Sequence, residues 1–314
     1  MRELTRYRTN LVEERARSVN RLQKRLEDTN LKLGDVVTDI MGKSARAILD
    51  ALLAGQTDSA TLAELARGRM KAKRAELEQV LVGTLKPHHR FMLREHLVLI
   101  DTLEEAVTRA TQEIETRMSP PDPEHQSPVP LGDEGPHENE TIGEGQHERL
   151  PLKWMDAVKL LDTIPGINAR TAQGIIAEVG TDMSRFKNAR HLASWAGMCP
   201  GTNESAGKRL QGKTRKGSLW RHKLLVEAAH AAAHTKNTYL SAQYHRIAAR
   251  RGAKTAMIAV GHTLLTVIYH LLSEHQPYPD LGGNYFDEQD RQVTQKRLVR
   301  RLEKLGYQVS VSAA

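Results

Sequence analysis

Apolar residues recur every three or four positions through the first 118 residues, which is the spacing of one face of an α-helix. This pattern predicts a long helix over 2–31 and shorter helices over 44–53, 59–66 (capped by Ser59 or Thr61) and 71–82. A second long helix should begin at Pro87 and run to Met118. The apolar positions of the two long helices are Leu4, Leu11, Val19, Leu22, Leu26, Phe91, Leu93, Leu97, Ile100, Leu103, Val107 and Ile114.

An apolar stripe on a helix has to be buried against something. The two long helices could pair as an antiparallel coiled coil, or the stripe of the second could join two copies of the chain. Neither helix carries the strict heptad repeat that would decide between these arrangements. We therefore predict a helical, coiled-coil region over residues 1–118 and a homo-oligomer formed through it.

The pattern stops at residues 119–150, which are rich in proline, glycine and acidic side chains. Such a segment has too little apolar surface to fold, and we expect a disordered linker. Helical spacing resumes in a second domain over 151–275, followed by a tail over 276–314 that contains a basic helix from Gln289 to Leu305. Because no alternating strand pattern exceeds a few residues, the sequence predicts a mainly α fold.

The net positive charge of the chain indicates the kind of partner that it binds. The 314 residues carry a formal net charge of +8 with a pI near 9.5, and residues 119–150 hold eight acidic side chains against Arg149 alone. The rest of the chain therefore carries +15, which favours a polyanionic partner. The single cysteine, Cys199, fits a reducing cytosol. No signal peptide is evident, and the most apolar run, 256–272, is interrupted by Gly261 and two histidines, so we expect no membrane partner.

The second domain opens with Ile164-Pro165-Gly166-Ile167-Asn168, which has the form of a helix-hairpin-helix turn. Asn168 stands in the slot of a second glycine, and we expect it to tolerate a positive φ there. Such a turn directs backbone N–H groups of the next helix, which begins around Arg170, towards a phosphate without reading any base. A helical hairpin with no nucleic-acid contact is the alternative.

Residues 197–221, GMCPGTNESAGKRLQGKTRKGSLWR, place one serine, Ser205, among glycines and cations. A flexible basic loop can hold phosphates, and an exposed hydroxyl within it can act as a nucleophile. Turn-forming serines are common, so the pattern alone favours phosphate binding. Nearby, Trp195 is expected in the core, and the spacing of His230 and His234 matches no metal motif. The cations of the run are Lys208, Arg209, Lys213, Arg215, Lys216 and Arg221, and a second basic cluster, Arg246, Arg250, Arg251 and Lys254, is either a solvated helix end or a phosphate site.

The Ile-Pro-Gly-Ile turn, the run around Ser205 and the long apolar helix after it together resemble the transposases of the insertion sequence 110, 116 and 902 family. The basic helix YRTNLVEERARSVNRLQKRLE resembles the start of that family's middle region. The resemblance implies an N-terminal RuvC-like domain with four acidic metal ligands, a coiled-coil region, and a transposase domain with a nucleophilic serine. Members recombine DNA through a covalent link to that serine, and some use a structured bridge RNA as a guide.

Applied to this chain, the resemblance implies that Ser205 is the nucleophile. It also implies that the cations after Ser205 bind phosphates of DNA or RNA. Gly166, Asn168, Arg170 and Arg221 are the further expected nucleic-acid contacts. Ser218 is a competing serine, but it occupies a slot normally held by asparagine and is expected to cap the next helix. The family's arginine after Lys216-Gly217 has no exact counterpart, with Arg221 nearest to its place.

The resemblance begins at the family's middle region. We therefore expect the RuvC-like domain, and the Mg²⁺ that it binds, to be supplied by another polypeptide. We expect no cofactor in this chain and a location in the bacterial cytoplasm on the nucleoid. Three functions stay open: a recombinase part that acts with a RuvC-like half in trans, a catalytically inactive nucleic-acid binder that regulates a full-length transposase, and a purely structural coiled-coil partner.

Overall fold

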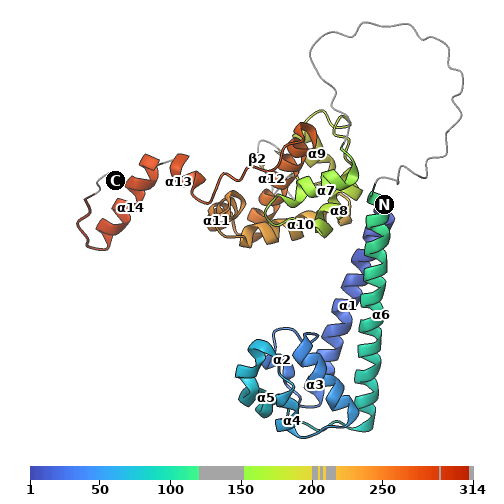
Figure 1. Cartoon of the computed structure of the whole chain (residues 1–314). Helices are drawn as coiled ribbons and strands as arrows, with labels where there is room; N and C mark the ends of the chain where they lie inside the picture. The colour runs from blue at the N-terminus through green and yellow to red at the C-terminus, as the bar shows by residue number, and fades with distance from the viewer. Residues whose placement is uncertain (120–151, 200–203, 206–207, 210–216, 290, 311–314) are drawn as a thin grey trace, which may run out of the picture. The chain divides into compact units, whose positions relative to one another are not determined.

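The computed structural model is built almost wholly of helices, which confirms the prediction of a mainly α fold (Figure 1). It describes residues 1–119, 152–199, 204–205, 208–209, 217–289 and 291–310. These fall into two compact units, one made of nearly all of residues 1–117 and one of the residues from Met118 onwards. Apart from Ser119, the predicted linker lies outside the described residues, and its disorder stays a prediction.

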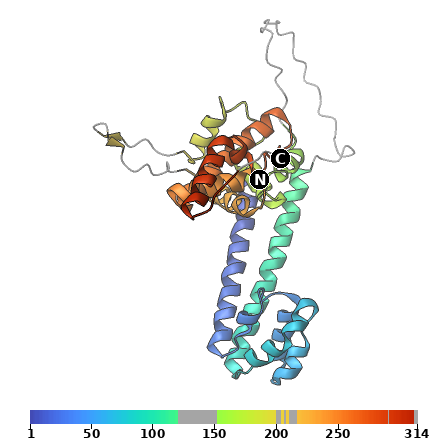
Figure 2. The ribbon, with the colours of Figure 1, turned by 90° about the vertical axis from the view of Figure 1, so that its left-hand side faces the viewer.

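Two long antiparallel helices dominate the first unit (Figures 1 and 2). They are α1, Arg2–Asp28, and α6, Pro87–Met118, so both predicted long helices are confirmed. An ion pair of 3.1 Å between Arg15 and Glu104 joins their midpoints. The two long helices, which form a stalk, therefore pair antiparallel within one chain, and a homo-oligomer formed through them stays a prediction. One position of the expected stripe is wrong, because Phe91 is 62% exposed on the outer side of α6.

A lobe of short elements packs against the ends of the stalk helices that lie near Leu26 and Leu93. It contains α2 (Leu33–Val36), α3 (Lys43–Ala54), α4 (Ser59–Glu64), the 3₁₀ helix η1 (Gly68–Lys73) and α5 (Arg74–Val80). The expected helix over 71–82 is therefore split between η1 and α5. The cap of α4 is Asp58 rather than Ser59 or Thr61, since its carboxylate accepts the Thr61 N–H at 2.9 Å. The lobe shares one core, formed by Leu22, Leu26, Leu31, Leu33, Ile48, Leu49, Leu62, Leu77, Leu93, Leu97 and Ile100.

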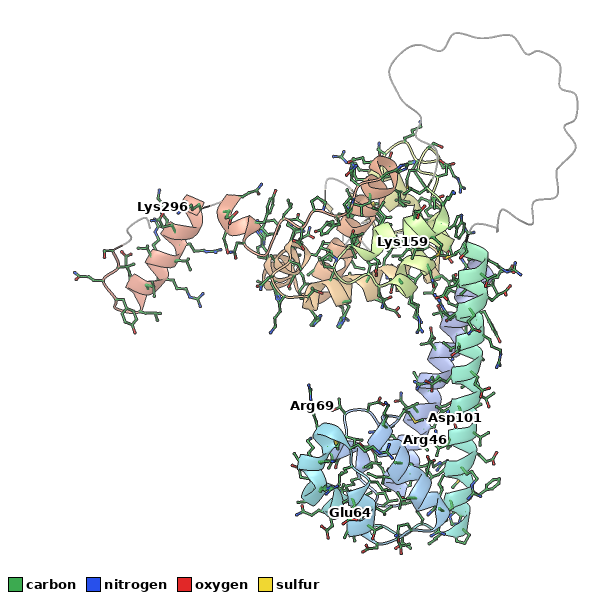
Figure 3. All side chains as sticks on the ribbon, viewed as in Figure 1. Arg46, Glu64, Arg69, Asp101, Lys159 and Lys296 are labelled. Atoms are coloured by element: carbon green, nitrogen blue, oxygen red, sulfur yellow. The ribbon has the colours of Figure 1, made fainter. Side chains whose placement is uncertain are left out.

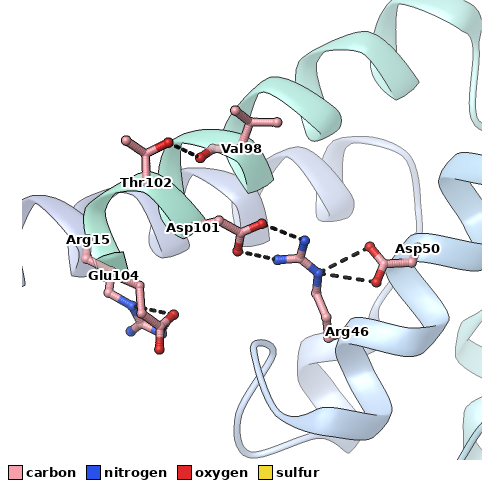
Figure 4. Close-up of polar contacts among 7 residues, drawn as sticks. All are labelled: Arg15, Arg46, Asp50, Val98, Asp101, Thr102 and Glu104. Carbon is pink, nitrogen blue, oxygen red and sulfur yellow. Dashed lines mark hydrogen bonds and ion pairs between the residues drawn. The ribbon is translucent and has the colours of Figure 1, made fainter. Parts of the chain in front are cut away.

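Arg46 fastens the lobe to the stalk (Figure 4). Its guanidinium donates two hydrogen bonds of 2.8 Å to the two oxygens of Asp101 on α6, and it also contacts Asp50 one turn along α3. The paired bonds to Asp101 are the main reason that the pKa of Arg46 is raised. A two-pronged pair of this kind fixes the angle between two helices as well as holding them together.

The second unit is a helical bundle built from α7 (Trp154–Asp162), α8 (Ala169–Val179), α9 (Ala189–Trp195), α10 (Leu219–His234), α11 (Tyr239–Arg251) and α12 (Ala253–Glu274). The predicted helical hairpin is confirmed as α7, the turn 163–168 and α8. Helix α12 lies at the centre and contacts α7, α9, α10 and α11. Two further helices follow, α13 (Tyr285–Gln289) and α14 (Arg291–Lys304), the latter being the expected basic helix.

Helix α12 is the one described helix that is long and apolar enough to cross a membrane by length and composition. In the sequence, Gly261 and the histidines interrupt the apolar run and hide this property. The apolar side chains of α12 have a partner within the bundle: Ala256, Val260, Leu264, Leu265, Ile268, Leu271 and Leu272 are buried. Packing of the core therefore accounts for its composition.

Candidate nucleic-acid interface

The turn between α7 and α8 is pressed against the backbone of α10. Gly166 has a φ of +88°, and a Cβ placed on it would lie 2.3 Å from the amide nitrogen of Ala232 and 2.8 Å from the carbonyl oxygen of Ala228. Ile164 and Ile167 on either side are buried. The glycine is thus required by the packing of the hairpin on α10, and its contact with a phosphate stays a prediction.

Asn168 does not have the expected positive φ. Its φ is −98° in extended backbone, and its side-chain oxygen accepts the Thr171 N–H at 2.9 Å as the N-cap of α8. Ser, Thr, Asp and Asn favour this position because they satisfy one of the helix's orphan N–H groups. Asn168 and Arg170 are both exposed at the positive end of the helix dipole, where an anion is stabilised.

The loop that carries Ser205 leaves and re-enters the bundle at a single point. A Cβ on Gly217 would lie 2.7 Å from the carbonyl oxygen of Ala196 and 3.1 Å from the Cα of Gly197. The chain therefore closes between Gly197 and Gly217, and we call residues 198–216 the serine loop. Its first residue, Met198, is buried, and the end of its side chain lies against Gly261 of α12.

Within the serine loop the backbone forms a two-stranded antiparallel hairpin of β1, Glu204–Ser205, and β2, Lys208–Arg209. Ser205 stands opposite Lys208 and Glu204 opposite Arg209. In the backbone, Ser205, the predicted nucleophile, is therefore paired with Lys208, the first cation of the serine loop. Arg209, the second, is the next residue along β2. Lys213, Arg215 and Lys216 lie outside the described residues, so their placement stays a prediction.

A stacked arginine–tryptophan pair flanks the point where the serine loop closes. The guanidinium carbon of Arg221 on α10 lies 3.7 Å from the ring centroid of Trp195 on α9, and Phe186 packs its edge against the same indole at 5.3 Å. Trp195 is 39% exposed, so the expectation of a core residue is wrong. The pair ties the helix before the serine loop to the helix after it, and it presents an aromatic surface to solvent.

Ser218 is the N-cap residue of α10, as predicted from its position. Its backbone oxygen accepts the His222 N–H at 3.1 Å, but its side chain forms no capping hydrogen bond. The next residue, Leu219, is 77% exposed.

Three exposed cations near this pair were not identified from the sequence. Arg185 and Lys187 flank Phe186 in the connection between α8 and α9, and Arg190 lies in the first turn of α9. The Tyr269 hydroxyl donates to the Phe186 carbonyl at 3.3 Å and so holds this connection on α12. The run RFKNAR, with three cations in six residues, was the available signal.

The structure separates the predicted contacts into two groups along α10. The turn at Gly166 packs on Ala228 and Ala232, whereas Arg221 lies in the first turn of the same helix. At 1.5 Å per residue, Arg221 and Ala232 are about 16 Å apart along the axis. One phosphate cannot bridge both groups, so a nucleic acid that used both would have to follow α10.

The second basic cluster lies on α11 and the start of α12. The Arg246 guanidinium is 4.7 Å from the ring centroid of Phe286, which also stacks on Tyr239 at 5.2 Å. These contacts dock α13 on α11. Arg250, Arg251 and Lys254 are exposed on the same stretch.

Among the residues that the structure describes, no three His, Cys, Asp or Glu side chains come together in a way that could hold a metal ion. His234 instead bonds through its Nδ1 to the His230 carbonyl at 2.7 Å.

Comparison with known proteins finds a family match within this bundle. The sequence signature described as "Transposase IS116/IS110/IS902 family" matches residues 158–246, from within α7 to within α11, including the whole serine loop. A protein of Streptomyces coelicolor described as the mini-circle putative transposase for IS117 is 29% identical over 116 residues. That match covers 34% of this chain and 28% of the relative. Residues 158–246 thus match the transposase signature of this family, and the chain spans less than a third of the length of this relative.

Proposed function

We propose that the second unit is a DNA-recombining transposase domain that holds a phosphodiester at the serine loop and links it to Ser205. The observation that carries this proposal is the closure of the serine loop between Gly197 and Gly217. A loop whose ends are fixed on a buried core presents its residues from a defined place. The hairpin register supports the proposal further, since it sets Ser205 opposite Lys208.

The chemistry assigned to Ser205 is a transesterification. Its hydroxyl oxygen attacks the phosphorus, a new P–O bond to serine forms, and the P–O bond to one deoxyribose oxygen breaks. The serine proton leaves and the departing sugar oxygen takes up a proton, so one diester replaces another. The strand is thereby held on the protein without loss of bond energy, and the reverse attack by a different sugar hydroxyl joins new partners.

The cations of the serine loop supply binding and charge stabilisation. Lys208, Arg209, Lys213, Arg215 and Lys216 lie within twelve residues of Ser205 in sequence. Positive side chains around a phosphoryl group offset the charge that builds up on its oxygens in the transition state. Arg221, fixed on the Trp195 ring, adds a cation at the base of the loop.

Further partners belong to the same proposal. A RuvC-like half supplied in trans would bring the metal-binding carboxylates, a structured guide RNA would choose the DNA, and the stalk helices would join copies of the chain. These assignments rest on the family resemblance. Phosphate binding by the second unit rests in addition on its own exposed cations, which include Arg185, Lys187 and Arg190.

Salt-dependent binding tests the proposal. The full chain should bind a 30-base-pair DNA duplex with an affinity that falls steeply with salt. Replacing the five loop cations with glutamine should reduce the slope of log K against log salt by about 0.9 for each phosphate that the loop no longer neutralises. Ser205→Ala should leave the affinity unchanged because the hydroxyl carries no charge. An unchanged slope in the five-fold variant would rule out the loop as the phosphate site.

A second function fits the Trp195–Arg221 surface equally well: a nucleic-acid binder that regulates a complete transposase without cutting DNA. Stacking and cation contacts suffice for that role. It shares the salt dependence but predicts that no covalent protein–DNA species forms under any condition.

A further inference from the structure

The lobe of the first unit carries a concentration of positive charge that no described carboxylate neutralises. Five cations fall within eight residues, with no acidic side chain among them: Arg67, Arg69, Lys71, Lys73 and Arg74. All five are exposed, and η1 itself contains no buried residue. Only Met70 in this stretch packs partly against the lobe core. Packing into the lobe core thus explains Met70, and it does not explain why this segment carries five positive charges.

These cations differ from those of the stalk in what they contact. Within the described part of the chain, none of the five forms an ion pair with a carboxylate. Lys73 donates to the Val36 carbonyl at 3.1 Å and Arg74 to the Glu64 carbonyl at 3.2 Å, both neutral acceptors that leave the charge intact. Exposed stalk cations are neutralised by neighbours, as in the pairs Arg17–Glu14, Arg25–Asp28 and Arg109–Glu105.

The extended rise of η1 spreads this charge over the length of the segment. A 3₁₀ helix rises about 2 Å per residue, so Arg67 and Arg74 are about 14 Å apart. One strand of a duplex presents a phosphate about every 3.4 Å along its axis, which gives about four phosphates over that length. The two carbonyl bonds fix Lys73 and Arg74 in place, and Arg69 points away from the lobe (Figure 3).

We propose that the segment Arg67–Arg74 is a second nucleic-acid binding surface that holds the phosphodiester backbone of DNA or RNA on the first unit. The proposal deepens the nucleic-acid binding proposed above, but it concerns residues of the other unit, outside the transposase domain at 158–246. It accounts for unpaired charge at the lobe in a chain whose net charge is +8. Recognition is of the backbone, since lysine and arginine on an exposed segment select phosphates and not bases.

The test is a charge-matched comparison in the full chain. One variant carries Arg67→Gln, Arg69→Gln and Lys71→Gln; the control carries Arg17→Gln, Arg25→Gln and Arg109→Gln, which removes the same charge from paired positions. Binding to a 30-base-pair DNA duplex and to an RNA duplex of equal length is measured between 50 and 200 mM salt. Circular dichroism checks that the first unit is folded in both variants, since the three tryptophans all lie in the second unit.

The lobe variant should lose on the order of tenfold in affinity at 50 mM salt, with a salt slope shallower by about 0.9 per phosphate released, and the control should change far less. A loss on one duplex alone identifies that nucleic acid as the ligand. Equal affinity of both variants and wild type overturns the proposal and leaves the serine loop unaffected. If the wild-type chain binds neither duplex, both proposals fail. A lobe variant that changes only the sedimentation of the protein marks the cluster as a protein interface and also overturns it.

Discussion

At the scale of residues, Gly166 and Asn168 have different roles in the turn between α7 and α8: Gly166 allows close packing on α10, and Asn168 caps α8. The sequence predicted a tight turn here correctly, since Pro-Gly between apolar residues permits little else. It did not predict that Gly166 faces the backbone of α10, because that contact joins residues more than sixty positions apart. Asn168 was expected to adopt a positive φ, and it caps α8 instead because its side-chain oxygen satisfies the Thr171 N–H.

The prediction that Trp195 is buried in the core was wrong for a related reason. Its flanking residues Leu192, Ala193 and Ala196 are buried, and the helical pattern alone suggested that the indole follows them. Its partner is the cation of Arg221, twenty-six positions later, and a cation–π contact leaves part of the ring in solvent. Ser205 was identifiable only by the resemblance, since a serine between small residues has no physical signature of its own.

The contact at Gly166 predicts an effect on stability. Gly166→Ala should cost more than about 2 kcal/mol, because the new Cβ overlaps the Ala232 backbone in addition to straining φ. Gly180 provides the control: it has the same φ of +88°, but nothing lies within 4 Å of an added Cβ. Trp fluorescence in urea isolates the effect, since Trp154, Trp195 and Trp220 all lie in the second unit. Equal losses for Gly166→Ala and Gly180→Ala would show that packing on α10 contributes nothing.

At the scale of elements, long periodic helices were predicted well and short ones less so. Helix α6 has the predicted bounds, and α1 ends three residues early because Asn30 adopts a φ of +61° and turns the chain. Over 71–82 the pattern missed η1, whose residues carry almost no apolar signal. The hairpin of β1 and β2 was not predicted, since two-residue strands are too short to show an alternation.

The stalk predicts a pH dependence. His96 is half-buried on α6, and its pKa is lowered by burial and by Arg25 and Arg21 of α1. A lowered pKa in the folded state means that unfolding takes up a proton between that pKa and the ordinary value near 6.5. The first unit should therefore be destabilised as pH falls through 6.5 and regain stability as pH rises above it.

His96→Gln should reduce this pH dependence, measured by urea unfolding of the full chain at pH 5 and pH 7.5. Circular dichroism should report the change, while Trp fluorescence from the second unit should not. Part of the dependence should remain, because the pKa of His89 is also lowered, by burial and by His88 and Lys86. A variant with the full wild-type dependence would show that His96 titrates as it does in the unfolded chain.

At the scale of the whole molecule, the chain combines a first unit, which has a stalk and a basic lobe, with a helical second unit that matches a transposase family signature over residues 158–246. Composition predicted the polyanionic partner, because a charge of +15 outside residues 119–150 is typical of proteins that bind polyanions. Composition alone could not show which cations form ion pairs with carboxylates and which are left to bind a partner. Ion pairs neutralise Arg15 within the stalk and Arg46 where the lobe meets the stalk, whereas Arg69 and its neighbours form no ion pair with a described carboxylate. Only the folded arrangement distinguishes the two kinds of position.

The central claim is that Ser205 forms the covalent link to DNA. The most direct measurement is to incubate the chain with a DNA duplex and a separately expressed RuvC-like half, digest with protease and nuclease, and locate the nucleotide remnant by mass spectrometry. We predict a remnant on Ser205 that is lost in Ser205→Ala and retained in Ser218→Ala. A remnant on Ser218, or an adduct that persists in Ser205→Ala, would contradict the claim.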